Sequence, residues 1–172
     1  NEELTRLYRA SGSLISGASL NLQELAQKIV GVVQEEFGQA NCSLLVVQKD
    51  SNELVRLAAA GPYADQVKYQ NLALDGPGLV PRAIRTNKVV NAGDVHSDPD
   101  YVQGWDAAQS ELVIPLKVGD DVIGVIDVQS SEPSTFSPDD EHLMTIFAER
   151  AALVLEHSRL NTKTEVRMQQ LV

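Results

Sequence analysis

The chain has 172 residues, of which 14 are basic and 24 acidic, and its formal net charge at pH 7 is −10. This length fits one domain that buries about two-thirds of the surface of its unfolded chain, and the acidic surface argues against nucleic acid and anionic lipid as partners. A single cysteine, Cys42, excludes an internal disulfide and a multi-thiolate metal site, and no apolar run reaches the roughly 18 residues of a membrane span.

Two amphipathic helices are predicted at the N-terminal end. In residues 1–16 the apolar side chains fall on one helical face. The second helix is predicted over Leu22–Phe37, where apolar residues recur at i, i+3, i+4 and i+7. Asn21 is its expected N-cap, Glu24 completes a capping box, and Gly38 stands where a C-terminal cap belongs.

A hairpin and several shorter elements are predicted next. The strand-forming runs Cys42–Gln48 and Leu54–Ala60 are separated by the turn-rich segment KDSNE. Beyond them the sequence predicts, in order, a short strand within Tyr69–Leu74, a turn over Asp75–Gly78, a short helix over Leu79–Asn87 and a brief strand at Val89 and Val90.

The residues from Ala92 to Gln109 are polar with isolated aromatic side chains, which predicts a long loop. Ordered long loops in compact domains are often functional. A second hairpin is predicted over Leu112–Val118 and Val122–Gln129. Its second strand is apolar on both faces, so we expect it at the centre of a sheet between two covering layers. Pro115 predicts a bulge or a locally open edge in the first strand.

The last helix is predicted to begin at Ser137, its N-cap, with Pro138 in the first turn. Past Leu155 its apolar stripe narrows to one apolar or small residue per turn, at Leu160, Thr164, Met168 and Leu171. A seam of this width is typical of a helix that pairs with another in a coiled coil. We therefore expect a homodimer that forms through the terminal helices.

Four segments occur in a fixed order along the chain: Asp94-Val95, Val113-Ile114-Pro115-Leu116, Val122-Ile123-Gly124-Val125-Ile126 and Phe136-Ser137-Pro138-Asp139-Asp140. With these segments the chain resembles the GAF domain family of small-molecule sensors, and the resemblance covers nearly the whole length. It implies an α/β (α+β) fold, similar to PAS domains, with a central antiparallel sheet of about six strands and helices on both faces. It also implies a single domain over residues 1–172, with 1–17 and 156–172 as flanking signalling and dimerisation helices, in a two-component phosphorelay or second-messenger protein.

The resemblance raises three classes of ligand. Bilin-binding members carry an anchoring cysteine after the Asp-containing loop, and residues 91–109 contain none, so we expect no covalent bilin. Cyclic-nucleotide-binding members share Asn-Lys followed by Phe-x-x-x-Asp-Glu. Asn87-Lys88 and Phe136–Glu141 match that motif, which implies an ion pair between Lys88 and Asp140 that braces the pocket. The same residues also suit a turn, a core anchor and a helix N-terminus. The third class is another small ligand or none, so the cofactor is unknown.

Candidate ligand contacts come from the loop, the second hairpin and the segment that follows the first hairpin. Tyr63, Tyr101 and Trp105 are expected as walls of a pocket, Leu112, Ile114, Ile126 and Val128 as its floor, and Asp94 and His96 complete the set. Four possible cation ligands alternate along one segment: Asp94, His96, Asp98 and Asp100. The segment lacks the glycine and the terminal glutamate of a calcium loop, so no metal site is assigned.

No catalytic residue is assigned, because no serine or cysteine stands in a nucleophile motif. A methionine-sulfoxide reductase related to this fold would need several cysteines, so we expect no enzyme.

Two interpretations of function stay open. In the first, a small-molecule ligand binds between the sheet and the loop Asn91–Gln109 and shifts the population of helix packings. In the second, the domain is a ligand-free dimerisation and relay module, and a cyclic-nucleotide-binding regulatory domain is a further alternative. We expect no nucleic acid and no membrane contact. The initial Asn1 predicts a fragment of a longer protein, and the cysteine content favours a cytoplasmic one.

Overall fold

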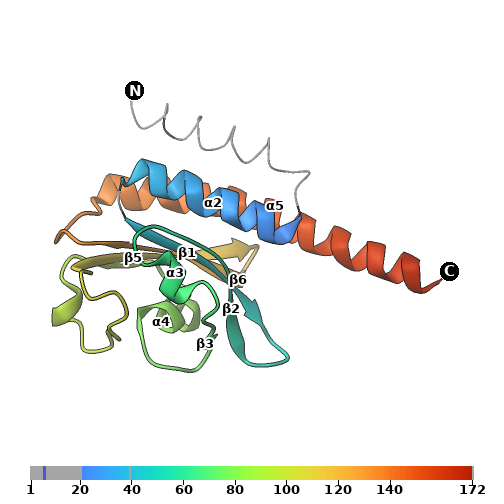
Figure 1. The fold of residues 1–172 in the computed structure, drawn as a ribbon, viewed down its shortest axis with the longest axis horizontal. Coiled ribbons are helices and arrows are strands. Elements are labelled where there is room, and N and C mark those ends of the chain that lie inside the picture. Colours follow the sequence, from blue (N-terminus) through green and yellow to red (C-terminus); the bar gives the residue numbers. More distant parts are fainter. Residues whose placement is uncertain (1–5, 7–20, 39, 172) are drawn as a thin grey trace.

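In the computed structural model the described residues are 6, 21–38 and 40–171. They form, in chain order, α2 (Leu22–Glu36), β1 (Asn41–Gln48), β2 (Glu53–Ala60), α3 (Ala64–Val67), β3 (Leu72–Ala73), α4 (Leu79–Thr86), β4 (Val90–Ala92), η1 (Val95–Ser97), β5 (Ser110–Val118), β6 (Asp121–Ser130) and α5 (Pro138–Gln170). Helices α2 and α5 lie side by side over one face of the sheet, while α3, α4 and the long loops lie on the other (Figure 1). The predicted helix over residues 1–16 falls outside the described residues except for Arg6.

The sheet has six strands in the order β3-β2-β1-β6-β5-β4, and every neighbouring pair is antiparallel. This confirms the predicted α+β fold and the central place of the strand over Val122–Gln129, which is β6. Strands β1 and β6 approach closely at Gly124, where a Cβ atom would overlap the carbonyl oxygen of Leu45. Only glycine allows that approach without a shift of the backbone. The predicted irregularity near Pro115 occurs as a register shift between Leu116 and Lys117.

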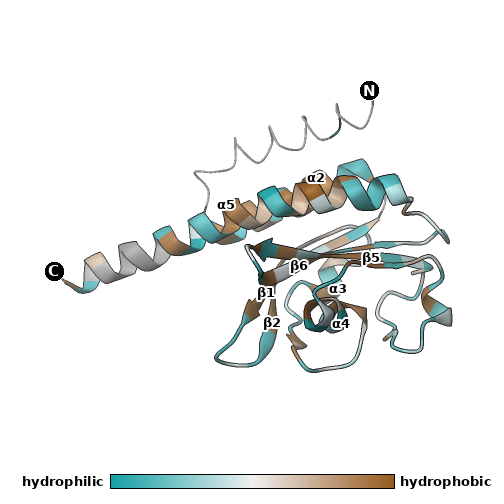
Figure 2. Cartoon of the chain, turned by 180° about the vertical axis from the view of Figure 1, so that it is seen from behind, coloured by the Kyte–Doolittle hydropathy of each residue, from teal (hydrophilic) through white to brown (hydrophobic). Residues whose placement is uncertain are grey.

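The two faces of the sheet carry different sets of buried side chains, because successive residues of a strand point to opposite sides. On the helix side, strand residues join α2 and α5 in one core; these are Cys42, Leu44, Leu112, Ile114, Leu116, Ile126 and Val128. On the other side, Leu45, Val113 and Val125 pack against α4 and Val95 in a second core. In Figure 2 the strands β5 and β6 are predominantly hydrophobic, and hydrophobic stretches of α2 and α5 lie over them.

Both long helices begin where their capping residues predict. The Asn21 side chain accepts a hydrogen bond from the backbone N–H of Glu24 at 2.8 Å. At the start of α5, Ser137 and Asp140 form a capping box, in which each side chain accepts from the other residue's backbone N–H. Helix α5 has 33 residues and extends well beyond the sheet at its C-terminal end (Figure 1). Within the described part of the chain, no helix is both long and apolar enough to cross a bilayer.

Candidate functional site

The sheet face opposite α2 and α5 holds a cavity of about 220 Å³. Its floor comes from β1, β2, β5 and β6, and its walls come from the segment 60–81 and the loop 101–105. The lining residues include Asn41, Ser43, Arg56, Ala59, Tyr63, Gln70, Pro81, Tyr101, Trp105, Glu111, Asp127 and Gln129. The floor is thus polar and charged, whereas the rest of this sheet face is the apolar core with α4.

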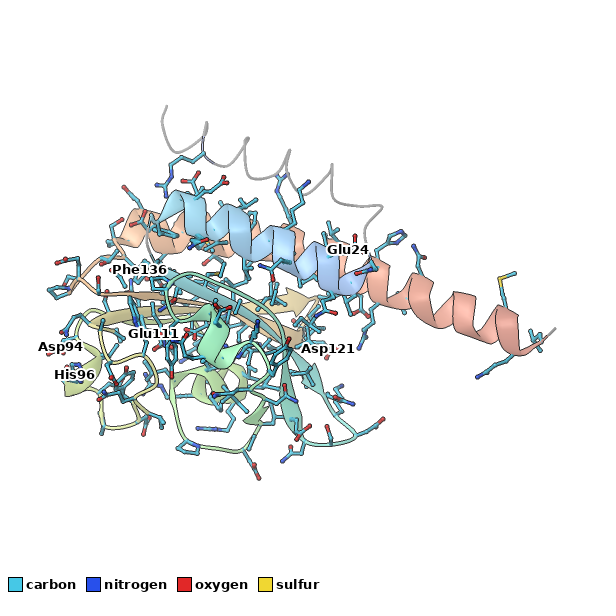
Figure 3. The ribbon with its side chains drawn as sticks, in the orientation of Figure 1. Glu24, Asp94, His96, Glu111, Asp121 and Phe136 are labelled. Carbon is cyan, nitrogen blue, oxygen red and sulfur yellow. The ribbon has the colours of Figure 1, made fainter. Side chains whose placement is uncertain are left out.

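Two acidic side chains occupy the centre of that floor. Glu111 of β5 is 3% exposed and Asp127 of β6 is 8% exposed. Glu111 pairs with Gln129 and Val113 pairs with Asp127, so the two acids are diagonal neighbours on one face of adjacent strands. Figure 3 shows Glu111 inside the fold rather than at its surface. The Gln129 amide donates to Glu111 Oε1 at 3.2 Å, which fixes one oxygen of that carboxyl group.

The two carboxyl groups lie within reach of each other, and only a protonated carboxyl group could donate a hydrogen bond in that pair. Burial raises the pKa of Glu111 well above its usual value, and the negative charge of Asp127 raises it further. Burial also raises the pKa of Asp127, against the opposing effects of the Glu111 hydrogen bond and the Arg56 charge. Like charges this close do not both ionise easily, so the pair titrates as a unit.

Arg56 of β2 is the basic side chain of this floor. Its Nε donates to the carbonyl oxygen of Gln70 at 3.0 Å, and its backbone N–H donates to Asn71 Oδ1 at 3.1 Å. Burial lowers the pKa of Arg56, and the charges of Asp127 and Glu111 raise it in opposition. One half-buried cation therefore stands against two buried carboxyl groups.

Three buried polar atoms round the cavity have no hydrogen-bond partner among the described residues: Asn41 Nδ2, Tyr101 Oη and Asp127 Oδ1. Asn41 is held in place through its other side-chain atom, because Oδ1 accepts from the backbone N–H of Tyr63 at 2.7 Å. The pKa of Tyr101 is raised to about 12, first by burial and then by the charges of Glu111 and Asp127. Buried polar atoms in native proteins are nearly always paired, so three such atoms round one cavity indicate a place for a polar molecule.

The loop that closes the cavity is tied to α4 by one arginine. Arg82 donates to both carboxylate oxygens of Asp98, at 2.9 Å from Nη1 and 2.9 Å from Nη2. Nη1 also donates to Asp100 at 2.8 Å. The guanidinium hydrogen bond lowers the pKa of Asp98. Two of the four residues considered as cation ligands are therefore engaged by Arg82.

Three of the candidate ligand contacts lie in the cavity wall: Tyr63, Tyr101 and Trp105. Asp94 and His96 do not line the cavity and lie at the outer edge of the fold (Figure 3). Asp94 caps the short helix η1, accepting from the backbone N–H of His96 at 3.1 Å. The His96 ring packs edge-on against Tyr101 with 5.7 Å between centroids, so it supports the wall from behind.

The expected floor is corrected by one residue along each strand. Leu112, Ile114, Ile126 and Val128 all point to the other face, into the core with α2 and α5. The strand residues that alternate with them point to the cavity and form its floor; these include Glu111, Asp127 and Gln129. A register change of one residue exchanges the two faces of a strand, and in β5 and β6 both faces are largely apolar, so alternation alone could not choose between them.

The expected ion pair between Lys88 and Asp140 is also corrected. Asp140 accepts from Arg6 Nη1 at 3.3 Å and closes the capping box with Ser137. Among the described residues no ion pair joins it to Lys88.

Sequence reasoning missed Glu111, Asp127 and Arg56. The signal that marks the two acids is that each interrupts an apolar strand, in SELVIP and in VIDVQ. Asp and Glu are almost never fully buried unless they are paired. An acid in each of two neighbouring central strands therefore predicts either a paired buried site or a functional one.

The comparisons with known proteins agree with this fold. A family model described as GAF domain matches residues 19–156. Protein YtsP of Bacillus subtilis (strain 168) is 35% identical over 74 residues, which are 43% of this chain and 45% of that protein. The chain's match thus spans about half the length of this curated relative.

Two solved structures are similar over most of the chain. The GAF domain from an Acinetobacter phosphoenolpyruvate-protein phosphotransferase has a TM-score of 0.83 at 21% identity, covering 95% of this chain and 98% of that one, a likeness of fold. The type II free methionine-R-sulfoxide reductase from Thermoplasma acidophilum has a TM-score of 0.70 at 28% identity, covering 80% of this chain and 96% of that one. With the family match over residues 19–156 and the shared sheet architecture, the chain belongs to the GAF domain family.

Proposed function

We propose that this GAF domain is a sensory module that binds a small ligand in the cavity above Glu111 and Asp127, and that it passes occupancy to its terminal helices within a signal-transduction protein. The observation that carries the proposal is the set of unpartnered buried atoms on Asn41, Tyr101 and Asp127. Each costs about 1–3 kcal/mol when it is left unpaired, and a polar ligand in the cavity would remove that cost.

The size and charge of the cavity favour a compact metabolite. Pockets for drug-sized ligands measure about 300–1,000 Å³, and this cavity is smaller, at about 220 Å³. The buried acids Glu111 and Asp127 oppose the phosphate of a cyclic nucleotide, and the ion pair expected to brace such a site is not formed. A cyclic nucleotide is therefore the weaker alternative.

A reductase is the second candidate, because a free methionine-R-sulfoxide reductase is among the similar structures at 28% identity. The residue that bears on it is Cys42, the one cysteine of the chain. Its pKa is raised well above the usual value, first by burial and then by the charge of Asp127, and the thiolate is the reactive form of cysteine. A catalyst that resolves through a disulfide also needs a second cysteine. We therefore propose binding without catalysis.

The output step is proposed from the surface of α5. Leu153, Leu160 and Met168 are exposed by 61%, 51% and 64% of their surface, and they follow one another along the helix at the near-heptad spacing of a paired helix. A homodimer through the terminal helices would cover them. Light scattering of the purified chain tests this part, and a monomer at micromolar concentration would exclude it.

The binding step is tested by thermal denaturation of the chain with a panel of free amino acids, methionine sulfoxide, cyclic AMP and cyclic GMP. We expect a concentration-dependent rise in melting temperature with at least one compact polar compound. Ala59→Leu fills the cavity and should abolish that rise, whereas Ala107→Leu adds the same atoms at an exposed position of the loop and should leave it unchanged. A panel without any shift favours the ligand-free relay module. Turnover of methionine sulfoxide with a thiol reductant would favour the reductase.

A further inference from the structure

The charges in the cavity floor do not cancel when both acids are ionised. Arg56 is the only basic side chain among the described residues that line the cavity, and it faces Glu111 and Asp127. With both carboxylates ionised, the floor carries one excess negative charge in a buried place where charge is costly. One monovalent cation balances it. A proton on either acid can do so when no ligand is bound, because burial raises the pKa of both.

One carboxylate oxygen is free to receive a donor from the cavity. Asp127 is 8% exposed, lines the cavity and leaves Oδ1 without a partner. Glu111 has one oxygen held by Gln129. Tyr63 and Tyr101 also line the cavity, and a phenol side chain carries no positive charge in either protonation state. The thiol of Cys42 lies on the other face of the sheet, in the core with α2 and α5. None of them can supply the missing positive charge.

The wall opposite the acids suits an organic cation. Tyr63, Tyr101 and Trp105 line the same cavity and place aromatic rings round it. An ammonium group gains from the face of an aromatic ring, and more so where water is excluded. Carboxylates below and aromatic rings beside are together the chemistry that recognises a protonated amine.

We propose that the ligand of this cavity carries a protonated amine, and that its ammonium group enters in exchange for the proton that Glu111 and Asp127 share. This proposal rests on the proposed function of small-ligand binding. No covalent bond to carbon changes. The O–H bond of the acid pair breaks, its proton passes to water, and the N–H groups of the ligand take its place beside two carboxylates. The charge of the floor is the same before and after.

Four related compounds separate the amine from the rest of the ligand: L-methionine, its methyl ester, N-acetyl-L-methionine and N-acetyl-L-methionine methyl ester. They combine the presence or absence of an ammonium group with the presence or absence of a carboxylate. Titration calorimetry should give affinities at least about tenfold higher for each amine than for its acetylated partner, as expected for the loss of a charge-assisted hydrogen bond. Equal affinities, or binding of neither amine, would overturn the proposal. Binding of the acetylated compounds alone would overturn it and leave the proposed function standing.

Proton exchange has its own signature. Below the pKa of the acid pair, each unit by which the pH is raised should increase the affinity for the methyl ester by up to about tenfold. About one proton should be released per ligand bound. Titrations in two buffers with different ionisation enthalpies count that proton. A release of no proton at every pH between 5 and 8 would contradict the exchange. KCl and MgCl2 titrated alone test inorganic cations, and an equal thermal shift with either salt would reject an organic amine.

Two variants assign the effect to the acids. In Glu111→Gln and in Asp127→Asn the remaining carboxylate is balanced by Arg56, so the ester should bind at least about tenfold more weakly, and proton release should fall to near zero. Asp121→Asn makes the same chemical change at the exposed far end of β6 and should behave as the wild type (Figure 3). If both cavity variants keep the wild-type affinity for the ester and the wild-type proton release, Glu111 and Asp127 do not bind the ammonium group. If either fails to fold, the comparison of amines with acetylated partners on the wild type decides.

Discussion

The attachment of the cavity loop to α4 can be measured through Arg82. Its side chain is 27% exposed and that of Asp98 is 18% exposed, so the bidentate pair is partly shielded from water, while Asp100 is 53% exposed. Exposed ion pairs contribute about 0.2–1 kcal/mol, and buried hydrogen bonds to charged groups about 1.5–3 kcal/mol. Since Asp98 lies between these limits, we expect a coupling energy of about 1–1.5 kcal/mol for Arg82 with Asp98. For Asp100 we expect about 0.5 kcal/mol.

The assay is a double-mutant cycle in urea at pH 7. Free energies of unfolding are compared for the wild type, Arg82→Met, Asp98→Asn and the double variant. Arg82→Lys keeps the charge and loses the planar fork, so it should retain less than half of the coupling energy. Because the pKa of Asp98 is lowered in the folded protein, its contribution is present above the unfolded pKa of about 3.9 and is lost as pH falls through the folded value. A coupling energy below about 0.3 kcal/mol at pH 7 would show that the pair does not hold the loop.

Three further predictions concern stability. The pKa of Glu111 is raised in the folded protein, so its stabilising contribution is present at low pH. That contribution is lost as the pH rises above the unfolded pKa of about 4.3 towards the folded pKa. Each unit by which the folded pKa exceeds the unfolded one corresponds to about 1.4 kcal/mol. The difference in unfolding free energy between Glu111→Gln and the wild type should therefore grow from pH 5 to pH 8, and a constant difference would contradict the raised pKa. Gly124→Ala should destabilise the fold by about 2 kcal/mol or more in urea denaturation, because the new methyl group overlaps the Leu45 carbonyl oxygen; a neutral effect would mean that β1 moves freely away. Ser137→Ala should cost about 1 kcal/mol through loss of the hydrogen bond to Asp140, and a melting temperature equal to that of the wild type would contradict the cap.

Most of the fold was predictable because its helices and hairpins have signals in their own local sequence. The cap at Asn21 and the capping box at Ser137 begin the helices where expected. Both predicted hairpins occur, as β1–β2 and β5–β6, within a residue or two of their predicted ends. The short helices α3 and η1 were not predicted, because each covers about one turn and lacks room for a periodic pattern.

The site was less predictable, because it depends on which face of each strand lies against the helices and which lies against the cavity. Tyr63, Tyr101 and Trp105 were predicted as walls of a pocket, and they line the cavity. Burial raises the pKa of both Glu111 and Asp127, and the charge of Asp127 raises that of Glu111 further. The two strands form one hairpin, but the segments 60–81 and 101–105 that cover this face of it lie elsewhere in the chain. An acid within an apolar run marks each residue locally, but the run alone does not show which face of the strand is covered.

Adjacent residues of β6 serve the two sides of the molecule. Asp127 forms part of the cavity floor, while Ile126 and Val128, on either side of it, are packed in the core with α2 and α5. Three consecutive residues of β6 thus connect the floor of the cavity with the core that α2 and α5 cover. Under the proposed function, a displacement of this strand at Asp127 would reach that core through the backbone of β6 itself.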